Sequence, residues 1–236
     1  MSEKVDLKGC SFVITEDKIY LNNGSFNTEL NQITKDFLLN DFSVSAKKLK
    51  KGMGRNKGAS FELDVSKKLS VWWYGVKKAI RRTPMSGGWS KTMAAGDLIC
   101  EFEDSWPFSI ECKHNKSWSF NELFLDGLGM IGKFWSQCVN ESPKNKIPVL
   151  VFRGNYGKTY VLIKKSDMVI SESILNGKIV SLKDQFNEPV LIFMFDLLLK
   201  LDPIKMLKDV VFNTKITPEK LEQDRKSAEQ KFKSDE

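Results

Sequence analysis

Asp97, Glu111 and Lys113 have the residue types and the spacing needed for chemistry on a phosphate group. Asp97 opens one β-like run, and Glu111 and Lys113 lie in the next run, interleaved with Ile110 and Cys112. Because side chains alternate along a strand, Glu111 and Lys113 are expected on one face and the two apolar residues on the other. If the two runs pair as a hairpin, Asp97 lies opposite Glu111, with their Cβ atoms about 5 Å apart. The sequence therefore predicts two adjacent carboxylates and an ammonium group facing one cleft.

Two carboxylates held opposite one another repel, so this pairing costs stability unless something neutralises the charge. A divalent cation would do so, because Mg²⁺ prefers carboxylates, waters and substrate phosphate oxygens as ligands. Lys113 could then hold an attacking water or stabilise charge on the phosphate. The same residues also allow a plainer alternative, a solvent-facing hairpin in which Lys113 neutralises the two acids.

The elements that must position these residues can be predicted from the sequence around them. The hairpin is expected from Asp97–Phe102 and Phe108–Lys113, which flank polar residues centred on Asp104. An amphipathic helix is expected over residues 59–80, where apolar side chains recur at helical spacing. Residues 81–95 contain a proline and two glycines and are expected to form a loop between helix and hairpin.

Further elements are expected on both sides of this region. They are β-like runs at 11–15 and 18–21, a turn at 22–24, a short helix at 33–39, a helix over 120–139, a strand pair at 147–152 and 158–163, a buried helix over 191–201, and a helix starting at 217–219. Residues 47–57 are rich in lysine and contain two glycines, so they are expected to form a mobile basic linker.

Basic residues are concentrated in one part of the chain. Between residues 44 and 82 there are twelve lysines and arginines and only two acidic residues, so this stretch carries +10 while the whole chain carries +7. Such a concentration is typical of a surface that binds a polyanion such as nucleic acid. A solvated helix face joined to a flexible loop would have the same composition, so this alternative stays open.

The histidine and cysteine counts exclude several kinds of site. His114 is the only histidine, which rules out metal sites built on several histidines. The four cysteines lie far apart without a C-x-x-C pair, so neither structural zinc nor a disulfide framework is expected. No apolar run approaches the roughly 20 residues of a membrane span, and the first residues lack a secretion signal. We therefore expect a soluble, cytoplasmic protein.

Four stretches resemble the PD-(D/E)xK nuclease superfamily in order and spacing, and within it the archaeal and phage Holliday-junction-resolvase-like branch. They are Gly58–Glu62, Arg82–Gly88, Gly96–Leu98 and Phe108–Lys113. Gly96 stands where the superfamily motif has proline. The resemblance implies an α/β, restriction-endonuclease-like core with a mixed central sheet flanked by helices. We expect this core at residues 51–168, an N-terminal extension with the basic linker at 1–50, and a helical C-terminal extension with a charged tail at 169–236.

The resemblance also assigns roles to the motif residues. Asp97 and Glu111 would ligate Mg²⁺, which Mn²⁺ could replace, aided by the main-chain carbonyl of Cys112. Lys113 would position or activate the attacking water. Glu62, on the preceding helix, would complete the metal site, although it could also be an exposed helix charge.

Other candidate residues surround this motif. Gln137 matches a polar residue that some members carry on the following helix, and Ser86 matches a serine that approaches the scissile phosphate in resolvase-like members. A surface amide and a turn residue are the simpler explanations for these two positions. The residues expected to contact DNA are Lys47, Lys48, Lys50, Lys51, Arg55, Lys57, Arg82, Ser86 and Lys91.

Together these features predict a Mg²⁺-dependent endodeoxyribonuclease that hydrolyses phosphodiester bonds. Branched DNA is the expected substrate, as for a Holliday junction resolvase in phage-type recombination, in the host cytoplasm if a phage encodes the protein. A homodimer is expected, because symmetric cutting of two strands needs two sites related by a two-fold axis. No organic cofactor or membrane partner is expected. Two alternatives stay open: a restriction or homing-type endonuclease that cuts linear duplex DNA, and a non-catalytic DNA-binding protein on the same scaffold.

Overall fold

The computed structural model shows a chain of two compact units, residues 1–47 and residues 48–236. The residues that it describes are 3–7, 10–14, 19–22, 27–30, 53–83, 96–115, 128–154, 157–167, 179–184, 186–209 and 216–233. No helix within these ranges is long and apolar enough to span a membrane.

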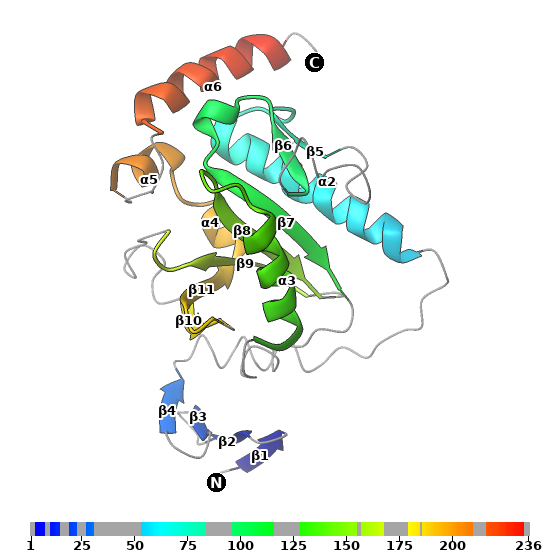
Figure 1. Cartoon of the computed structure of the whole chain (residues 1–236), viewed down its shortest axis with the longest axis vertical. Helices are drawn as coiled ribbons and strands as arrows, with labels where there is room; N and C mark the ends of the chain where they lie inside the picture. The colour runs from blue at the N-terminus through cyan, green and yellow to red at the C-terminus, as the bar shows by residue number, and fades with distance from the viewer. Residues whose placement is uncertain are drawn as a thin grey trace. The chain divides into compact units, whose positions relative to one another are not determined.

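The first unit contains a four-stranded antiparallel sheet in which each strand pairs with the next along the chain (Figure 1). Its strands are β1 (Glu3–Leu7), β2 (Cys10–Ile14), β3 (Ile19–Asn22) and β4 (Asn27–Leu30). The two β-like runs predicted at 11–15 and 18–21 are confirmed as β2 and β3. The short helix expected at 33–39 lies outside the described residues.

The second unit is built on a five-stranded mixed sheet with the order β10-β11-β9-β8-β7. Its strands are β7 (Phe108–His114), β8 (Ile147–Arg153), β9 (Thr159–Lys164), β10 (Ile179–Lys183) and β11 (Pro189–Met194). β7 and β8 run parallel, and the other neighbours run antiparallel. The mixed central sheet is therefore confirmed, and β7 is the last strand at one side of it.

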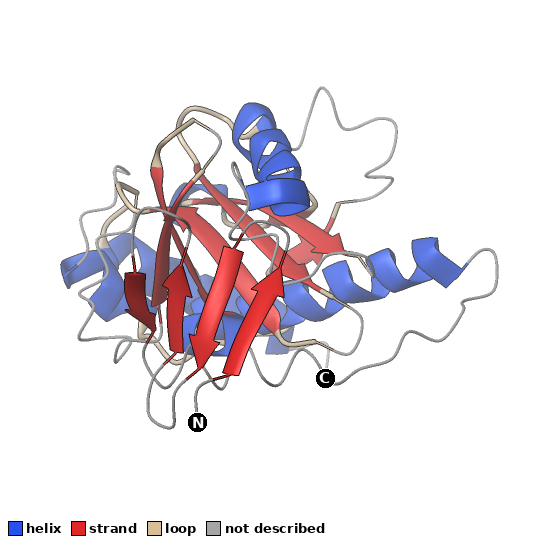
Figure 2. Ribbon diagram, turned by 90° about the horizontal axis from the view of Figure 1, so that it is seen from below, coloured by secondary structure: helices blue, strands red, loops and turns tan. Residues whose placement is uncertain are grey.

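Two helices cover opposite faces of this sheet next to β7 (Figure 1, Figure 2). α2 (Met53–Tyr74) packs on the face that carries Phe108, whose ring stacks on Trp72. α3 (Gly129–Glu141) connects β7 to β8, and its Phe134 lies under the ammonium group of Lys113. Since Phe108 and Lys113 are an odd number of residues apart on one strand, the two helices contact different faces. The flanking helices of the predicted fold are confirmed.

α2 begins and ends earlier than the helix predicted over residues 59–80. Its first turns, from Met53, fall in the stretch expected to be a mobile linker. Its end follows from Gly75, which has a φ of +76° that favours glycine and whose amide donates to the carbonyl of Val71. The apolar stripe of the prediction is confirmed, because Phe61, Val65, Leu69 and Trp73 are all buried in the core.

The predicted hairpin between residues 97–102 and 108–113 is wrong as a strand pairing. β6 (Leu98–Cys100) pairs instead with β5 (Ile80–Arg82), which follows α2 where the predicted helix was expected to end and the loop to begin. The residues between β6 and β7 form a 3₁₀ turn, Glu103–Ser105, followed by the buried Trp106. β7 is free to pair in parallel with β8 and is buried on both faces from Phe108 to Cys112, as parallel strands usually are.

A helical C-terminal extension is predicted from residue 169, and this is wrong for residues 179–183 and 189–194, which form the strands β10 and β11. Residues 189–194, expected in a buried helix, form β11, which lies between β9 and β10 and explains why this apolar run is buried. The helices that follow are α4 (Phe195–Leu198), α5 (Pro203–Asp209) and α6 (Pro218–Lys233). The predicted start of α6 is confirmed, since the amide of Lys220 donates to the hydroxyl of Thr217 over 3.2 Å.

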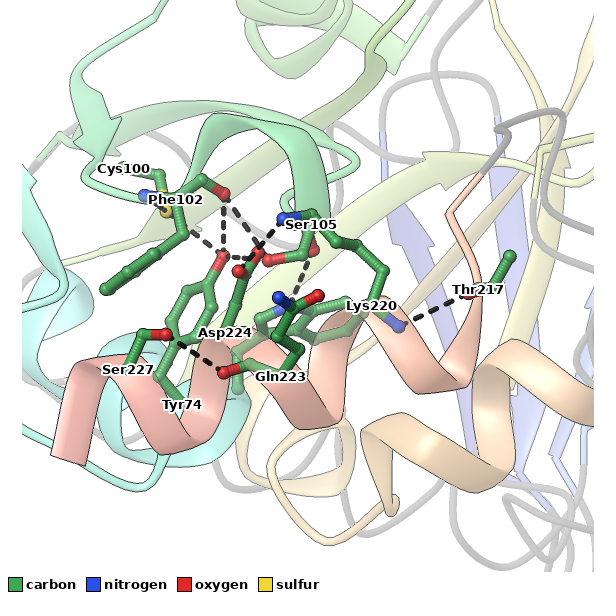
Figure 3. A network of polar contacts seen from close by, with 10 residues as sticks. Tyr74, Cys100, Phe102, Ser105, Thr217, Lys220, Gln223, Asp224 and Ser227 are labelled. Carbon is green, nitrogen blue, oxygen red and sulfur yellow. Dashed lines mark hydrogen bonds and ion pairs between the residues drawn. The ribbon is translucent and has the colours of Figure 1, made fainter. Parts of the chain in front are cut away.

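α6 packs on the C-terminal end of α2. Arg225 donates to the main-chain carbonyl of Trp73 over 2.7 Å, and Leu221 is fully buried. Figure 3 shows the polar network beside this contact, where the hydroxyl of Tyr74 donates to the carbonyl of Phe102 and lies 3.0 Å from the hydroxyl of Ser105. This network fixes the 3₁₀ turn that leads into β7.

Candidate active site

Glu111 and Lys113 project together from β7, as strand alternation predicts. The Nζ atom of Lys113 lies 2.5 Å from Oε1 of Glu111, and Glu111 is only 5% exposed. The same ammonium group lies 5.6 Å from the ring centroid of Phe134 on α3. Their neighbours Ile110 and Cys112 are buried toward α2. The structure thus brings a buried carboxylate and a partly exposed ammonium group together at the last strand of the sheet.

Asp97 lies beside Glu111 although β6 and β7 form no ladder. The amide of Asp97 donates to the carbonyl of Ile110, and its Oδ2 accepts a hydrogen bond from the amide of Cys112, both over 2.8 Å. These two bonds reach β7 on either side of Glu111. The predicted juxtaposition of Asp97 and Glu111 is therefore present, but two local hydrogen bonds produce it in place of a hairpin register.

Gly96 explains why the proline of the superfamily motif is absent. Its φ of +87° is closed to proline, whose ring fixes φ near −65°. A Cβ atom at this position would lie 2.5 Å from the carbonyl oxygen of Ile110. The chain is held in this approach, because Thr83 donates its hydroxyl proton to the carbonyl of Gly96 and its amide proton to that of Asp97. Glycine thus allows Asp97 to dock on β7.

The acids at this site carry more negative charge than their surroundings neutralise. Burial and the nearby charge of Glu111 raise the pKa of Asp97 to about 7. Burial also raises the pKa of Glu111, against the lowering effect of Lys113. Burial opposes the charge on Lys113, but its hydrogen bond to Glu111 raises its pKa overall. One ammonium group therefore does not balance the buried carboxylate of Glu111 and the partly buried carboxylate of Asp97.

Glu62 lies on α2 close enough to act on both of these acids. Its charge contributes to the raised pKa of Asp97 and of Glu111. Its carboxylate forms an ion pair with the Nε of Arg82 on β5, and its side chain is 13% exposed. Arg82, expected to contact phosphate, is thus in contact with Glu62. The structure brings Glu62 to the site and gives it a partner that sequence reasoning did not foresee.

The donor set of the site fits an oxygen-ligated divalent cation through two side chains. Across the ranges that the structure describes, no three Asp, Glu, His or Cys side chains are grouped closely enough to hold one ion. One carboxylate oxygen of Asp97 accepts a hydrogen bond from the amide of Cys112, and one carboxylate oxygen of Glu111 pairs with the ammonium group of Lys113. Their second oxygens and the carbonyl of Cys112 are hard oxygen donors of the kind that Mg²⁺ and Mn²⁺ accept, with water and phosphate completing the shell.

Gln137 lies on α3 and is exposed. Its amide nitrogen lies 3.3 Å from both carboxylate oxygens of Glu141, one helical turn later. The charge of Glu141 in turn raises the pKa of Glu111. Sequence reasoning missed Glu141, which lies two residues beyond the helix predicted over 120–139. In the structure α3 continues to Glu141, and a spacing of four residues places it on the same face as Gln137.

Most residues expected to contact DNA cannot be compared with the structure. Lys57 lies in the first turns of α2 and is partly exposed. Arg55 lies in the same helix, where its side chain is not described. The remaining positions lie outside the described residues: Lys47, Lys48, Lys50, Lys51, Ser86 and Lys91.

A family model described as "Phage putative PDDEXK endonuclease" matches residues 53–208, more than half of the chain. The match contains Glu62, Asp97, Glu111 and Lys113. The chain belongs to this family. Membership in the phage PDDEXK endonuclease family confirms the PD-(D/E)xK superfamily, indicates a nuclease and agrees with the restriction-endonuclease-like fold. No curated protein and no solved structure matches the chain.

Proposed function

We propose that the protein is a metal-dependent DNA endonuclease whose active site lies at β7. The observation that carries this proposal is the pair of carboxylates formed by the buried Glu111 and the partly buried Asp97, with the ammonium group of Lys113 at 2.5 Å from Glu111. Removing charged groups from water costs more free energy than one ion pair with a lysine usually recovers. Stability alone therefore seldom accounts for two carboxylates placed beside one lysine. A site that gains a cation and a phosphate recovers this cost.

Asp97, Glu111 and the carbonyl of Cys112 would hold Mg²⁺, or Mn²⁺ in its place. When bound, the ion supplies a Lewis acid for the phosphate and lowers the pKa of a bound water. The residues of the chain orient these parts. The hydrogen bond from Cys112 fixes the carboxylate of Asp97, and the ion pair with Lys113 fixes that of Glu111.

Lys113 has the position of a group that assists attack on phosphorus. Its Nζ is held between Glu111 and the ring of Phe134, and the side chain keeps partial exposure to solvent. An ammonium group so placed can donate a hydrogen bond to the attacking water or to a phosphate oxygen as charge develops. Glu62, held by Arg82, adds a third carboxylate from α2 and would complete the metal site through a bridging water.

Branched DNA is the substrate that we propose, with a homodimer as the acting form. The order and spacing of the motifs, which resemble the resolvase-like branch, support this choice. A dimer would supply two sites related by a two-fold axis, as paired cuts in a four-way junction require. The alternative of a restriction or homing-type enzyme uses the same site on linear duplex DNA, and the non-catalytic alternative retains DNA binding without cleavage.

A cleavage panel tests the proposal. Labelled four-way junction, flap, nicked and linear DNA would each be incubated with the protein in Mg²⁺ or in EDTA, with Lys113→Ala protein as the control for contaminating nucleases. Paired cuts in the junction that disappear in EDTA and in the variant are expected. Cutting of linear DNA alone would retain the chemistry and overturn the branched substrate, and binding without any cutting would support the non-catalytic alternative.

A further inference from the structure

Arg153 ends β8 next to the candidate active site. In the parallel register of β7 and β8 it pairs with His114, the residue after Lys113. Neighbouring strands lie about 4.8 Å apart, so the main chain of Arg153 is one strand spacing from that of His114. The amide of Asn115 donates to the carbonyl of Arg153 over 3.2 Å, which fixes the two strand ends together. Arg153 therefore lies at the same end of the sheet as Lys113.

The side chain of Arg153 is held by an aromatic ring. Its guanidinium carbon lies 4.5 Å from the ring centroid of Phe61, and the same ring contacts His114 edge-on at 5.7 Å. Phe61 is 1% exposed and belongs to the core, so it is a fixed platform. Stacking on an aromatic face orients a guanidinium group while leaving its N–H donors at the rim of the plane. The residue after Phe61 on α2 is Glu62, whose charge acts on both Asp97 and Glu111.

Arg153 differs from the other arginines whose side chains are described. Each of those arginines binds a carboxylate or main-chain carbonyls: Arg81 binds Glu101, Arg82 binds Glu62, and Arg225 binds Trp72 and Trp73. Within the described part of the chain, no acceptor contacts the guanidinium group of Arg153. A partly buried cation without an anionic partner costs free energy, which binding of an anion would recover.

We propose that Arg153 is a phosphate-binding residue that holds the DNA backbone next to the scissile phosphate, with Phe61 as its positioning residue. The proposal rests on the proposed function and adds a named contact to it. The planar fork of a guanidinium group matches two phosphate oxygens at once. Phosphates follow one another every 3.4 Å along the axis of each DNA strand, so a strand bound at Lys113 carries further phosphates past the end of β8.

The test is the salt dependence of DNA binding by Arg153→Gln. Fluorescence anisotropy with labelled junction and duplex DNA would be measured in EDTA, so that cleavage plays no part, from about 50 to 200 mM salt. The matched control is Lys183→Gln, which removes one positive charge from β10, at the opposite side of the sheet from β7. Thermal unfolding of both variants would separate a loss of binding from a loss of folded protein.

We expect Arg153→Gln to weaken binding roughly tenfold at the lowest salt and to reduce the slope of log K against log salt by about 0.9. Lys183→Gln should change neither quantity. Arg153→Lys should keep the slope and lose part of the affinity, because it keeps the charge without the stacked fork. A slope for Arg153→Gln equal to that of Lys183→Gln would overturn the inference and leave the proposed function intact. If the wild-type protein bound no DNA, the proposed function and this inference would both fail.

Discussion

Gly96→Ala is the substitution for which the structure gives the sharpest expectation. The new Cβ atom would lie 2.5 Å from the carbonyl oxygen of Ile110, which belongs to the main chain of β7 and cannot rotate away. A left-handed φ costs alanine about 1–2 kcal/mol, and forcing an extra methyl group into a packed site costs about 1–3 kcal/mol more. The free energy of unfolding should therefore fall by about 2–5 kcal/mol.

The same clash should displace Asp97. The amide of Asp97 donates to the carbonyl of Ile110, which the new methyl group would approach. Its carboxylate accepts a hydrogen bond from the amide of Cys112, two residues further along β7. Relief of the clash moves residue 96 away from β7, so both hydrogen bonds lengthen. We expect the surviving folded protein to bind metal more weakly and to cleave DNA far more slowly than the wild type.

Gly75→Ala is the matched control. Gly75 also has a positive φ, +76°, but no atom would lie within 4 Å of a Cβ atom there. Gly75→Ala should lower the free energy of unfolding only by the backbone strain, about 1–2 kcal/mol, and should leave cleavage unchanged. Urea unfolding followed by tryptophan fluorescence, together with cleavage rates, would compare the two variants. Equal losses of stability with full cleavage by Gly96→Ala would refute the argument that glycine is needed for the approach of Asp97 to β7.

Three other perturbations have definite expected outcomes. Lys113→Ala should lower the cleavage rate by roughly 10²–10³-fold while leaving DNA affinity nearly unchanged, because the charge of Lys113 is already paired with Glu111. Wild-type cleavage by this variant would disprove the role of Lys113. In EDTA, the raised pKa of Asp97, about 7 against about 3.9 unfolded, means that its contribution to stability is present at low pH and is lost as pH rises through 7. Asp97→Asn should therefore gain stability relative to the wild type as pH rises from about 4 to about 7, with little further change above that. A difference in unfolding free energy that does not change with pH would contradict the assignment. Neutralising four lysines of the basic stretch, Lys47, Lys48, Lys50 and Lys51, should weaken binding to all DNA sequences about equally and flatten its salt dependence. An unchanged slope of log K against log salt would show that these residues do not touch DNA.

Alternation along a strand was enough to predict the arrangement of Glu111 and Lys113, because this property depends only on local backbone geometry. The position of Asp97 beside Glu111 was also predicted, but for the wrong reason. A pairing between consecutive β-like runs is the simplest choice from sequence, whereas β7 pairs with β8 after a helical crossover. The continuous burial of β7 follows from that parallel pairing, and nothing within residues 97–113 reveals it.

The apolar run of β11 shows a second limit of sequence reasoning. A short apolar run bounded by polar residues is consistent with a buried strand or a buried helix, and periodicity alone does not separate them. The end of α2 could have been predicted, because glycine is a common helix-end signal and the predicted helix ran through Gly75. The stacking of Arg153 on Phe61 could not have been predicted, because the two residues lie on different elements and meet only in the folded protein.

The central claim is that Asp97 and Glu111 form a divalent metal site, and a titration of the DNA-free protein with Mn²⁺ tests it most directly. Calorimetry would compare the wild type with Asp97→Asn, and with Asp196→Asn as the control, which makes the same substitution at an exposed position on α4. We predict saturable Mn²⁺ binding by the wild type and by Asp196→Asn, competed by Mg²⁺, and its loss in Asp97→Asn. No saturable binding by the wild type, or equal binding by all three proteins, would contradict the account.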